Sequence, residues 1–309
     1  MNISQKLQII QQITGLTQEK LAQKLGVSFP TVNSWINGKS LPHKKTQGRI
    51  DGLYYQCTGE KGEPAKDILF VKKNIVERKR QEYKNISNLV HKRPDLYDQF
   101  VLSLTYNTNR IEGSTLTEPE TAAILFQDVA LSNKTLVEQL EAKNHQTALQ
   151  FLWRHCIEKK SVNEELILKM HSILLNGIHQ DAGMYRTHGV RIVGANVPTA
   201  NYMKVSRLMK GLFKDIKAVK KDAIAHCAAI HSRFEQVHPF SDGNGRIGRL
   251  LIHAMLLRQN LPPAVIKQEK KRKYISCLNR AQVKNDFVDL EEFICDAVLE
   301  GYKFIEQSL

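Results

Sequence analysis

The stretch HPFSDGNGRIGR, from His238 to Arg249, decides how this chain folds and what it can bind. Apolar residues recur at helical spacing on both sides of it, through Ile224–Val237 before and Ile247–Met255 after. Gly243 and Gly245 let the backbone between the two helices turn tightly and approach a ligand. The second helix would then present free N–H groups at its positive end, where a phosphate is favoured. The stretch therefore predicts a helix–loop–helix anion site.

The other polar residues of this stretch suit phosphate chemistry. His238 stands at the edge of the loop, where an imidazole could accept a proton from a hydroxyl. Asp242 offers a carboxylate to Mg²⁺, which binds proteins through few carboxylates and substrate phosphates. Arg246 and Arg249 are spaced i, i+3, so they share one helix face, and guanidinium groups fit phosphate oxygens. The alternative is a plain Gly/Asn turn with solvated arginines, and the number of fixed elements argues against it.

The stretch resembles the signature of the Fic family, His-Pro-Phe-x-Asp/Glu-Gly-Asn-Gly-Arg-x-x-Arg, at every fixed position. The resemblance covers roughly residues 75 to 300 and implies a mostly helical fold. It also implies transfer of AMP from ATP to a protein hydroxyl. The roles it implies are a general base at His238, a Mg²⁺ ligand at Asp242, an α-phosphate cradle at Asn244, Gly243 and Gly245, and clamps for the β- and γ-phosphates at Arg246 and Arg249.

A second match lies upstream at Thr108–Gly113, which reads TNRIEG. It resembles the family's inhibitory motif, Ser/Thr-x-x-x-Glu-Gly/Asn. The resemblance implies that Glu112 pairs with Arg249, displaces the γ-phosphate and leaves ATP in a non-productive pose. It also implies that Glu112 could orient a water and remove AMP again. Taken alone, the segment is equally a helix end that stops at Gly113.

A third segment alternates like a short strand over Val190–Gly194. It resembles the flap hairpin by which Fic proteins dock a target segment through backbone hydrogen bonds, with Val190, Ile192 and Gly194 in the flap. An ordinary surface hairpin is the alternative. Tyr274 stands where the family's adenine pocket is expected, although the pairing of residues there departs from the family pattern. Elsewhere in the core, Thr117-x-x-Glu120 and Ser161-x-x-Glu164 predict capping boxes at helix starts.

The N-terminal residues have a separate pattern. Thr17 and Ser28 are placed to cap two short helices separated by a turn at Gly26. The run from Trp35 to Pro42 reads Trp-x-x-Gly-Lys-x-x-Pro and ends the second helix. This pattern resembles the Cro/repressor type of helix-turn-helix, whose second helix enters the major groove of DNA. The residues expected to face DNA are Ser28, Phe29, Pro30, Asn33, Ser34 and Lys39. A helical protein-docking module is the alternative.

Composition agrees with two domains that face anions. The 309 residues carry a net charge of +14, which favours nucleic acid or nucleotide partners. Five dispersed cysteines fit a reducing compartment, so we expect a cytoplasmic protein without a membrane segment. The predicted division is a helix-turn-helix domain at 1–56, a linker at 57–74 and a Fic domain at 75–309.

The sequence thus predicts an all-α protein with a small β-hairpin flap, in which a DNA-binding head precedes an autoinhibited AMP-transferase. Its expected partners are ATP, Mg²⁺, a target protein with a Ser, Thr or Tyr hydroxyl, double-stranded DNA and a second copy of the chain in a homodimer. Two alternatives stay open. The Fic core could sense nucleotide within a transcription regulator, or it could transfer UMP, phosphate or phosphocholine.

Overall fold

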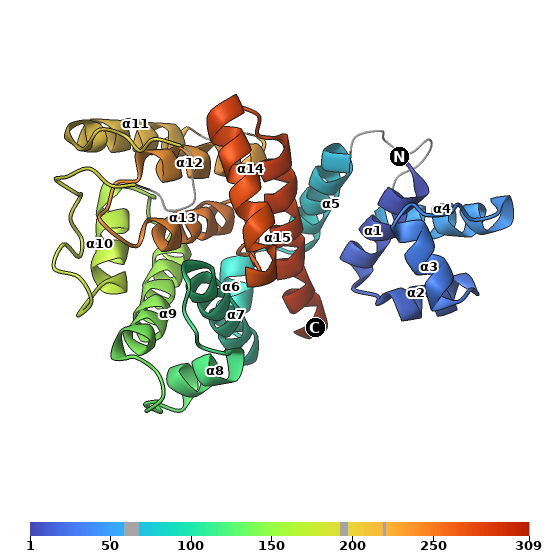
Figure 1. The fold of residues 1–309 in the computed structure, drawn as a ribbon, viewed down its shortest axis with the longest axis horizontal. Helices are drawn as coiled ribbons and strands as arrows, with labels where there is room; N and C mark the ends of the chain where they lie inside the picture. The colour runs from blue at the N-terminus through green and yellow to red at the C-terminus, as the bar shows by residue number, and fades with distance from the viewer. Residues whose placement is uncertain (59–67, 192–196, 219–220, 309) are drawn as a thin grey trace. The chain divides into compact units, whose positions relative to one another are not determined.

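The computed structural model describes residues 1–58, 68–191, 197–218 and 221–308. Backbone contacts divide the chain into two compact units, Met1–Gln81 and Glu82–Leu309, which are treated separately (Figure 1). Of the predicted linker 57–74, residues 59–67 lie outside the described residues, whereas 57–58 end the helix α4 (Lys44–Thr58) and 68–74 begin the helix α5 (Ile68–Glu82). Within the described ranges, no helix is both long enough and apolar enough to cross a membrane.

The N-terminal unit is a small helical bundle. Two of its helices match the sequence pattern closely, because Thr17 accepts a hydrogen bond from the Lys20 N–H and Gly26 ends the first of them in the left-handed region. Ser28 occupies the next N-cap position, but its hydroxyl contacts the Thr31 hydroxyl instead of a backbone N–H. The helices are α1 (Ile3–Thr14), α2 (Gln18–Leu25), α3 (Phe29–Ile36), α4 (Lys44–Thr58) and α5 (Ile68–Glu82). Their buried apolar residues include Leu7, Ile10, Leu21, Leu25, Val32, Trp35, Ile50 and Tyr54.

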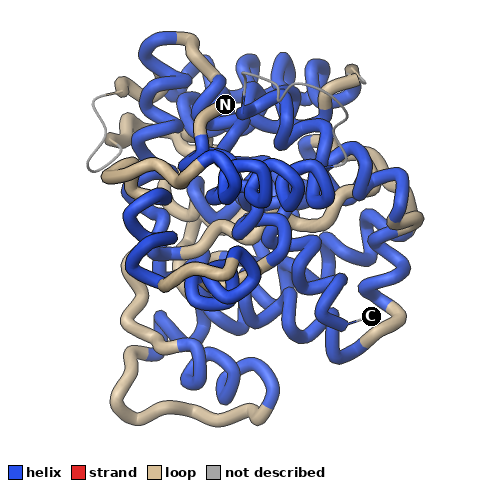
Figure 2. Tube along the Cα trace, turned by 90° about the vertical axis from the view of Figure 1, so that its right-hand side faces the viewer, coloured by secondary structure: helices blue, strands red, loops and turns tan. Residues whose placement is uncertain are grey.

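The second unit is also helical, and no strand occurs among the residues described in it (Figure 2). Its α-helices are α6 (Ile86–His91), α7 (Pro94–Glu112), α8 (Glu118–Phe126), α9 (Leu136–Ile157), α10 (Glu164–Leu174), α11 (Val205–Lys217), α12 (Ala223–Val237), α13 (Asn244–Arg258), α14 (Lys271–Lys284) and α15 (Val288–Ser308). Two short 3-10 helices, η1 (Tyr202–Lys204) and η2 (Gln268–Lys270), precede α11 and α14. The all-helical fold expected from the sequence is confirmed at this level.

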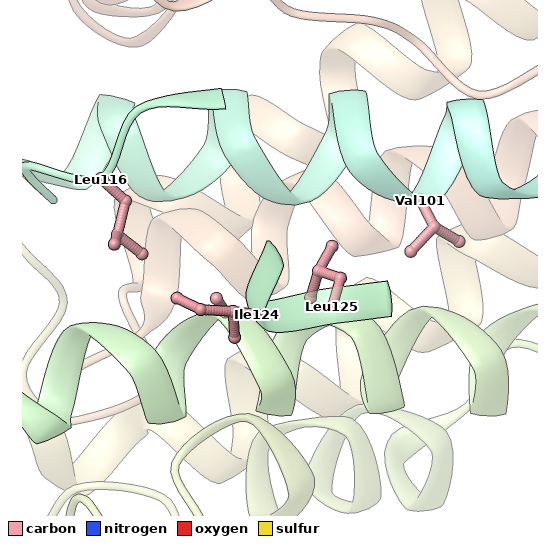
Figure 3. Packing of buried hydrophobic residues seen from close by; sticks show 5 residues of the cluster. Val101, Leu116, Ile124 and Leu125 are labelled. Carbon is pink, nitrogen blue, oxygen red and sulfur yellow. The ribbon is translucent and has the colours of Figure 1, made fainter. Parts of the chain in front are cut away.

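Helix α13 lies at the centre of this unit. Every residue from Ile247 to Leu257 is buried, so the helix is covered on all sides, and its neighbours include α7, α9, α10 and α12. A second apolar cluster packs α7, α8 and α9 together, with Val101, Leu116, Ile124 and Leu125 pointing toward one another (Figure 3). Helix α7, which carries Thr108 and Glu112, also contacts α13 directly.

Two local expectations from the sequence have different outcomes. The capping box at Thr117 is present, with Glu120 reaching back to the Thr117 N–H. The one expected at Ser161 is wrong: α10 begins at Glu164, and its cap is Asn163, whose side chain accepts from the Leu166 N–H. Asn is as good a cap as Ser, so nearby candidates cannot be ranked by residue type alone.

The β-hairpin expected in the flap is not seen among the described residues. Ile192 and Gly194 lie outside them, so the flap stays a prediction. The two described arms of this segment do meet, because the Thr199 hydroxyl donates to the Val190 carbonyl at 2.7 Å.

Candidate functional site: a phosphate-binding loop with two paired arginines

The loop between α12 and α13 is shaped by its own backbone. His238 ends α12 in the left-handed region at φ 49°, and its N–H still bonds to the Phe234 carbonyl. Gly243 precedes α13 at φ 76°, a conformation that glycine adopts without strain. The Asn244 side chain bonds to both the N–H and the carbonyl of Phe240, each at 2.9 Å. Its amide therefore braces the loop, and α13 opens at the expected helix N-terminus.

His238 is held as a neutral base. Its Nδ1 contacts the backbone carbonyl of Glu235 at 3.2 Å. Because a carbonyl can only accept, Nδ1 carries the proton and Nε2 keeps its lone pair. Burial lowers the pKa of His238 below its ordinary value, and the Arg186 charge adds to that effect. The imidazole can therefore accept a proton at neutral pH.

Arg186 fixes the position of the loop, a role that no sequence pattern predicted. It is 3% exposed, and its Nε donates to the His238 carbonyl at 2.7 Å. Its other nitrogens donate to the carbonyls of His188 and Ala200, on the two sides of the flap segment. A single buried guanidinium therefore ties the flap arms to the residue that would act as base. A lone arginine beside a strand-like run carries no sequence signal for this role.

His171 supports the other side of the loop. Its ring stacks on Phe240 with centroids 3.7 Å apart. Its Nδ1 accepts from the Gly183 N–H at 2.8 Å, and its Nε2 lies 3.1 Å from the Asp242 carbonyl. Burial lowers the pKa of His171 to about 4, so the ring is neutral at physiological pH. Sequence reasoning missed this residue, because it lies in α10, far from the loop along the chain.

Asp242 and Arg246 form a pair at the mouth of the loop. The Asp242 side chain is 54% exposed and lies 3.2 Å from an Arg246 nitrogen. Arg246 is buried and also binds Glu141 of α9 at 2.6 Å. Among the described residues, no group of three or more His, Cys, Asp or Glu side chains could hold a metal ion. One exposed carboxylate beside a phosphate site nevertheless fits Mg²⁺, which keeps several waters and binds largely through substrate phosphates.

Arg249 is bound on two sides by α7. Its Nε donates to the Thr108 hydroxyl at 2.6 Å, and a terminal nitrogen lies 2.5 Å from a Glu112 oxygen. The Arg249 side chain is 4% exposed, whereas that of Glu112 is 37% exposed. Burial raises the pKa of Glu112, but the Arg249 charge outweighs it and holds that pKa below its usual value. The pair expected between the inhibitory segment and the second arginine is thus formed, in its ionised state.

Tyr274 is buried within the helices instead of lining an open pocket. It is 4% exposed, and its hydroxyl lies 2.7 Å from His231 Nε2. Its ring stacks against Phe293 of α15. Burial raises the pKa of Tyr274, so it remains a neutral phenol. Its assignment to the adenine pocket stays a prediction.

The residues expected to face DNA lie at the surface of α3 and the turn after it. Phe29 is 45% exposed, so part of its ring is accessible at the surface of α3. Asn33 is half-buried and its side-chain oxygen accepts from Asn37, so part of its capacity is used within the helix. Ser34 bonds to the Ser40 hydroxyl at 2.7 Å. The exposed members of the set are Ser28, Phe29, Pro30 and Lys39.

This geometry defines a class of protein, one that combines a helical unit, in which a glycine loop opens onto a helix N-terminus beside two buried arginines, with a separate helix-turn-helix unit. The Fic/DOC family profile matches residues 161–256, which include the loop and the start of α13. A helix-turn-helix profile matches residues 14–46. The chain therefore contains a Fic/DOC domain and a helix-turn-helix domain.

Curated relatives share about a third of their residues with this chain over the Fic region. The protein adenylyltransferase Fic of Nematostella vectensis is 33% identical over 182 residues, which is 57% of this chain and 42% of the relative. The protein adenylyltransferase fic-1 of Caenorhabditis elegans is 30% identical over 220 residues, which is 70% of this chain and 42% of the relative. The matched regions thus span about two fifths of the length of these relatives.

Solved structures share the fold. Fic-1 from Caenorhabditis elegans superposes with a TM-score of 0.67 at 20% identity, covering 97% of this chain and 91% of that chain. A Fic domain containing signaling protein from Bacteroides thetaiotaomicron gives a TM-score of 0.64 at 24% identity, covering 76% of this chain and 94% of that chain. At these identities, the likeness concerns the fold.

Proposed function

We propose that this protein transfers AMP from ATP to a Ser, Thr or Tyr hydroxyl of another protein, and that Glu112 holds this activity low. The observation that carries the proposal is the placement of a neutral His238 at a loop that opens onto a helix N-terminus, with two buried arginines behind it. The relatives' name, protein adenylyltransferase, supports the same reaction.

The residues of the loop divide the work as follows. The Nε2 of His238 accepts the proton of the target hydroxyl while the hydroxyl oxygen attacks the α-phosphorus. The N–H groups at the start of α13, from Gly243 to Gly245, bind the oxygens of the α-phosphate. Bond breaking at the α-phosphorus releases pyrophosphate, whose charge is held by Arg246 and Arg249. Mg²⁺ bound at Asp242 would neutralise charge on the phosphates.

Inhibition follows from the partners of Arg249. A buried guanidinium has a limited set of donors, and Glu112 and Thr108 occupy those that face α7. A γ-phosphate that approaches Arg249 must displace the Glu112 carboxylate, and removing one partner of a buried ion pair is costly. The same carboxylate, at the edge of the site, is placed to orient a water against an AMP–protein bond. Glu112 would therefore serve both inhibition and AMP removal.

The group transferred can be read from the position of a label. Glu112→Gly protein is incubated with Mg²⁺ and ATP labelled at either the α- or the γ-phosphorus. Label on protein from α-labelled ATP alone supports AMP transfer. Label from γ-labelled ATP would indicate phosphate transfer, and nucleotide binding with no label from either would favour the alternative of a nucleotide-sensing regulator. Competition by unlabelled UTP and CDP-choline addresses the remaining alternatives.

For the N-terminal unit we propose binding to duplex DNA through α3. The observation that favours it is the exposure of Phe29 and Lys39 at the surface expected to face the groove. Phe29 can contact a thymine methyl group, and Lys39 can contact a phosphate. A mobility-shift experiment with the full chain at low salt tests this proposal. Failure to shift any duplex would favour a protein-docking role.

A further inference from the structure

Glu235 is a buried acid that the proposed reaction does not use. It lies in α12, three residues before His238, and is 6% exposed. Its Oε1 has no hydrogen-bond partner in the described structure, and its Oε2 lies 3.9 Å from His238 Nδ1. A buried ionised carboxylate without strong partners is very unfavourable, so such a group retains its proton. Burial indeed raises the pKa of Glu235 to about 8.

Two glycines of α13 make room for two acids. A Cβ at Gly245 would collide with Glu112 Oε1, and a Cβ at Gly248 would collide with Glu235 Oε1. Gly245 and Gly248 are one helical turn apart, and Arg249 follows directly. Glu112, and Glu235 whenever it is ionised, raise the pKa of Arg249 against the effect of burial. Arg249 thus binds the ionised Glu112 carboxylate of α7 and lies within electrostatic reach of the protonated Glu235 carboxyl of α12.

This arrangement determines the charge of Glu235 when the Glu112 carboxylate moves away from Arg249. Arg249 would remain a buried charge without a counter-ion, which is strongly unfavourable. The Arg249 charge lowers the pKa of Glu235 against burial, whereas Glu112 raises it. Loss of Glu112 therefore removes one repulsive charge and leaves the attraction, and both changes favour loss of the Glu235 proton.

We infer that Glu235 is a second carboxyl for Arg249, a positioning residue that ionises when Glu112 withdraws and regains its proton when a triphosphate takes Arg249. This inference rests on the proposed binding of ATP and extends it to proton exchange. Binding the γ-phosphate in the absence of Glu112 would then be coupled to uptake of one proton by Glu235. Nucleotide affinity would weaken as pH rises.

The other groups around Glu235 do not replace it in this role. From its own helix, His231 and His238 face it, and burial lowers the pKa of both rings, so both stay neutral. Tyr274 of α14 is a neutral phenol. His253 of α13 is likewise neutral, with its pKa lowered by burial and by Arg249. Because these groups stay neutral, Glu235, whose pKa burial raises to about 8, is the member of this cluster that can exchange a proton near neutral pH.

The test compares Glu112→Gly with the double variant Glu112→Gly/Glu235→Gln. Glutamine keeps the shape of the side chain and cannot ionise. For Glu112→Gly, we expect the KM for ATP to rise about tenfold per pH unit above a midpoint below 8, with kcat changing less. The double variant shares the titration of ATP itself and should lack this rise. Adding Glu158→Gln, which removes a surface acid, should leave the profile of Glu112→Gly unchanged.

Proton uptake gives a readout that does not need catalysis. The probe is an ATP analogue with a methylene group between the α- and β-phosphorus, titrated calorimetrically in buffers of different ionisation enthalpy. Glu112→Gly should take up close to one proton at pH 8 and almost none at pH 6. Because this comparison uses one protein, it holds even if the double variant folds poorly. Binding without proton uptake at pH 8 would overturn the role of Glu235, whereas no binding at all would overturn the proposed function.

Discussion

The arginines of the loop and the lysines of the N-terminal unit would both face phosphate, but the protein keeps them in opposite environments. Arg246 and Arg249 are buried and paired with Glu141 and Glu112. Lys39, like the lysines at the start of α4, is exposed to solvent. Buried charges need partners even without ligand, whereas exposed lysines exchange water and counter-ions for phosphate at little cost. In the proposed function, internal acids would therefore control nucleotide binding, and salt would control DNA binding.

The largest effect is expected from removing the general base, His238, beside the buried arginines. His238→Ala in the Glu112→Gly background should lower AMP transfer about 100- to 10,000-fold, because a positioned general base contributes that much. Affinity for ATP should change little, since the phosphates are held by α13 and the arginines. Transfer rates and nucleotide titrations check this together. A double variant that transfers AMP at the Glu112→Gly rate would remove His238 from the mechanism.

For the N-terminal unit, the informative quantity is the dependence of DNA affinity on salt concentration. The affinity of the full chain for duplex DNA should fall with a log–log slope of about −0.9 per phosphate contacted, and Lys39→Ala should reduce the slope by roughly one such contact. Fluorescence anisotropy from low to moderate salt measures both. Glu19→Gln, which alters a charge on α2, serves as a control. A slope that Lys39→Ala leaves unchanged would remove Lys39 from the interface.

Lowering the pH should reduce the free energy of unfolding through protonation of the buried His171. The pKa of His171 is lowered to about 4 in the folded protein, against an ordinary value near 6.5. The folded state therefore favours the neutral ring, and this stability is complete above 6.5 and lost as pH falls toward 4. Between pH 7 and 5, the wild type should lose roughly 2 kcal/mol more unfolding free energy than His171→Gln. Urea unfolding at both pH values measures the difference, and equal losses would contradict the assigned environment.

The smallest expected effect concerns the hydrogen bond between Arg249 and the Thr108 hydroxyl. Thr108→Val removes the hydroxyl that accepts from Arg249 Nε and keeps the shape of the side chain. A weakening of about 1 kcal/mol would raise AMP transfer roughly fivefold, well below the effect of removing Glu112. Thr105→Val, which alters a hydroxyl bonded to His145 instead, is the matched control. Equal rates for the two variants would mean that Thr108 does not help to hold Arg249.

Patterns of neighbouring residues correctly predicted helix caps and turns, because these features depend on residues close together in the sequence. The Thr17 cap, the Gly26 turn and the capping box at Thr117 follow from residue type and spacing, and all are present. Glu112 and Arg249 were paired through the family resemblance, and the structure brings them together from helices far apart in sequence.

What escaped prediction depends on the tertiary fold. Glu141 meets Arg246 across 105 positions, and Arg186 reaches His238 across 52, so no short-range spacing records either contact. The Asn244 side chain braces the loop because Phe240 offers both backbone groups, a detail of loop shape. Glu235 left no signal in the sequence, because Gln236, Ser232 and His231 adjoin it on the helix and such polar neighbours do not mark a buried position. Its burial beside Arg249 follows only from the tertiary packing.

The proposed inhibition requires that Glu112 keep Arg249 from the nucleotide. The most direct measurement is the rate of AMP transfer by wild type and by Glu112→Gly at equal ATP and Mg²⁺, from which charge-assisted hydrogen bonds worth about 1.5–3 kcal/mol predict a rise of roughly 10- to 100-fold. On a substrate that already carries AMP, Glu112→Gly should add AMP elsewhere but fail to remove it. Equal transfer rates for the two proteins would mean that Thr108–Gly113 is a helix end without regulatory effect.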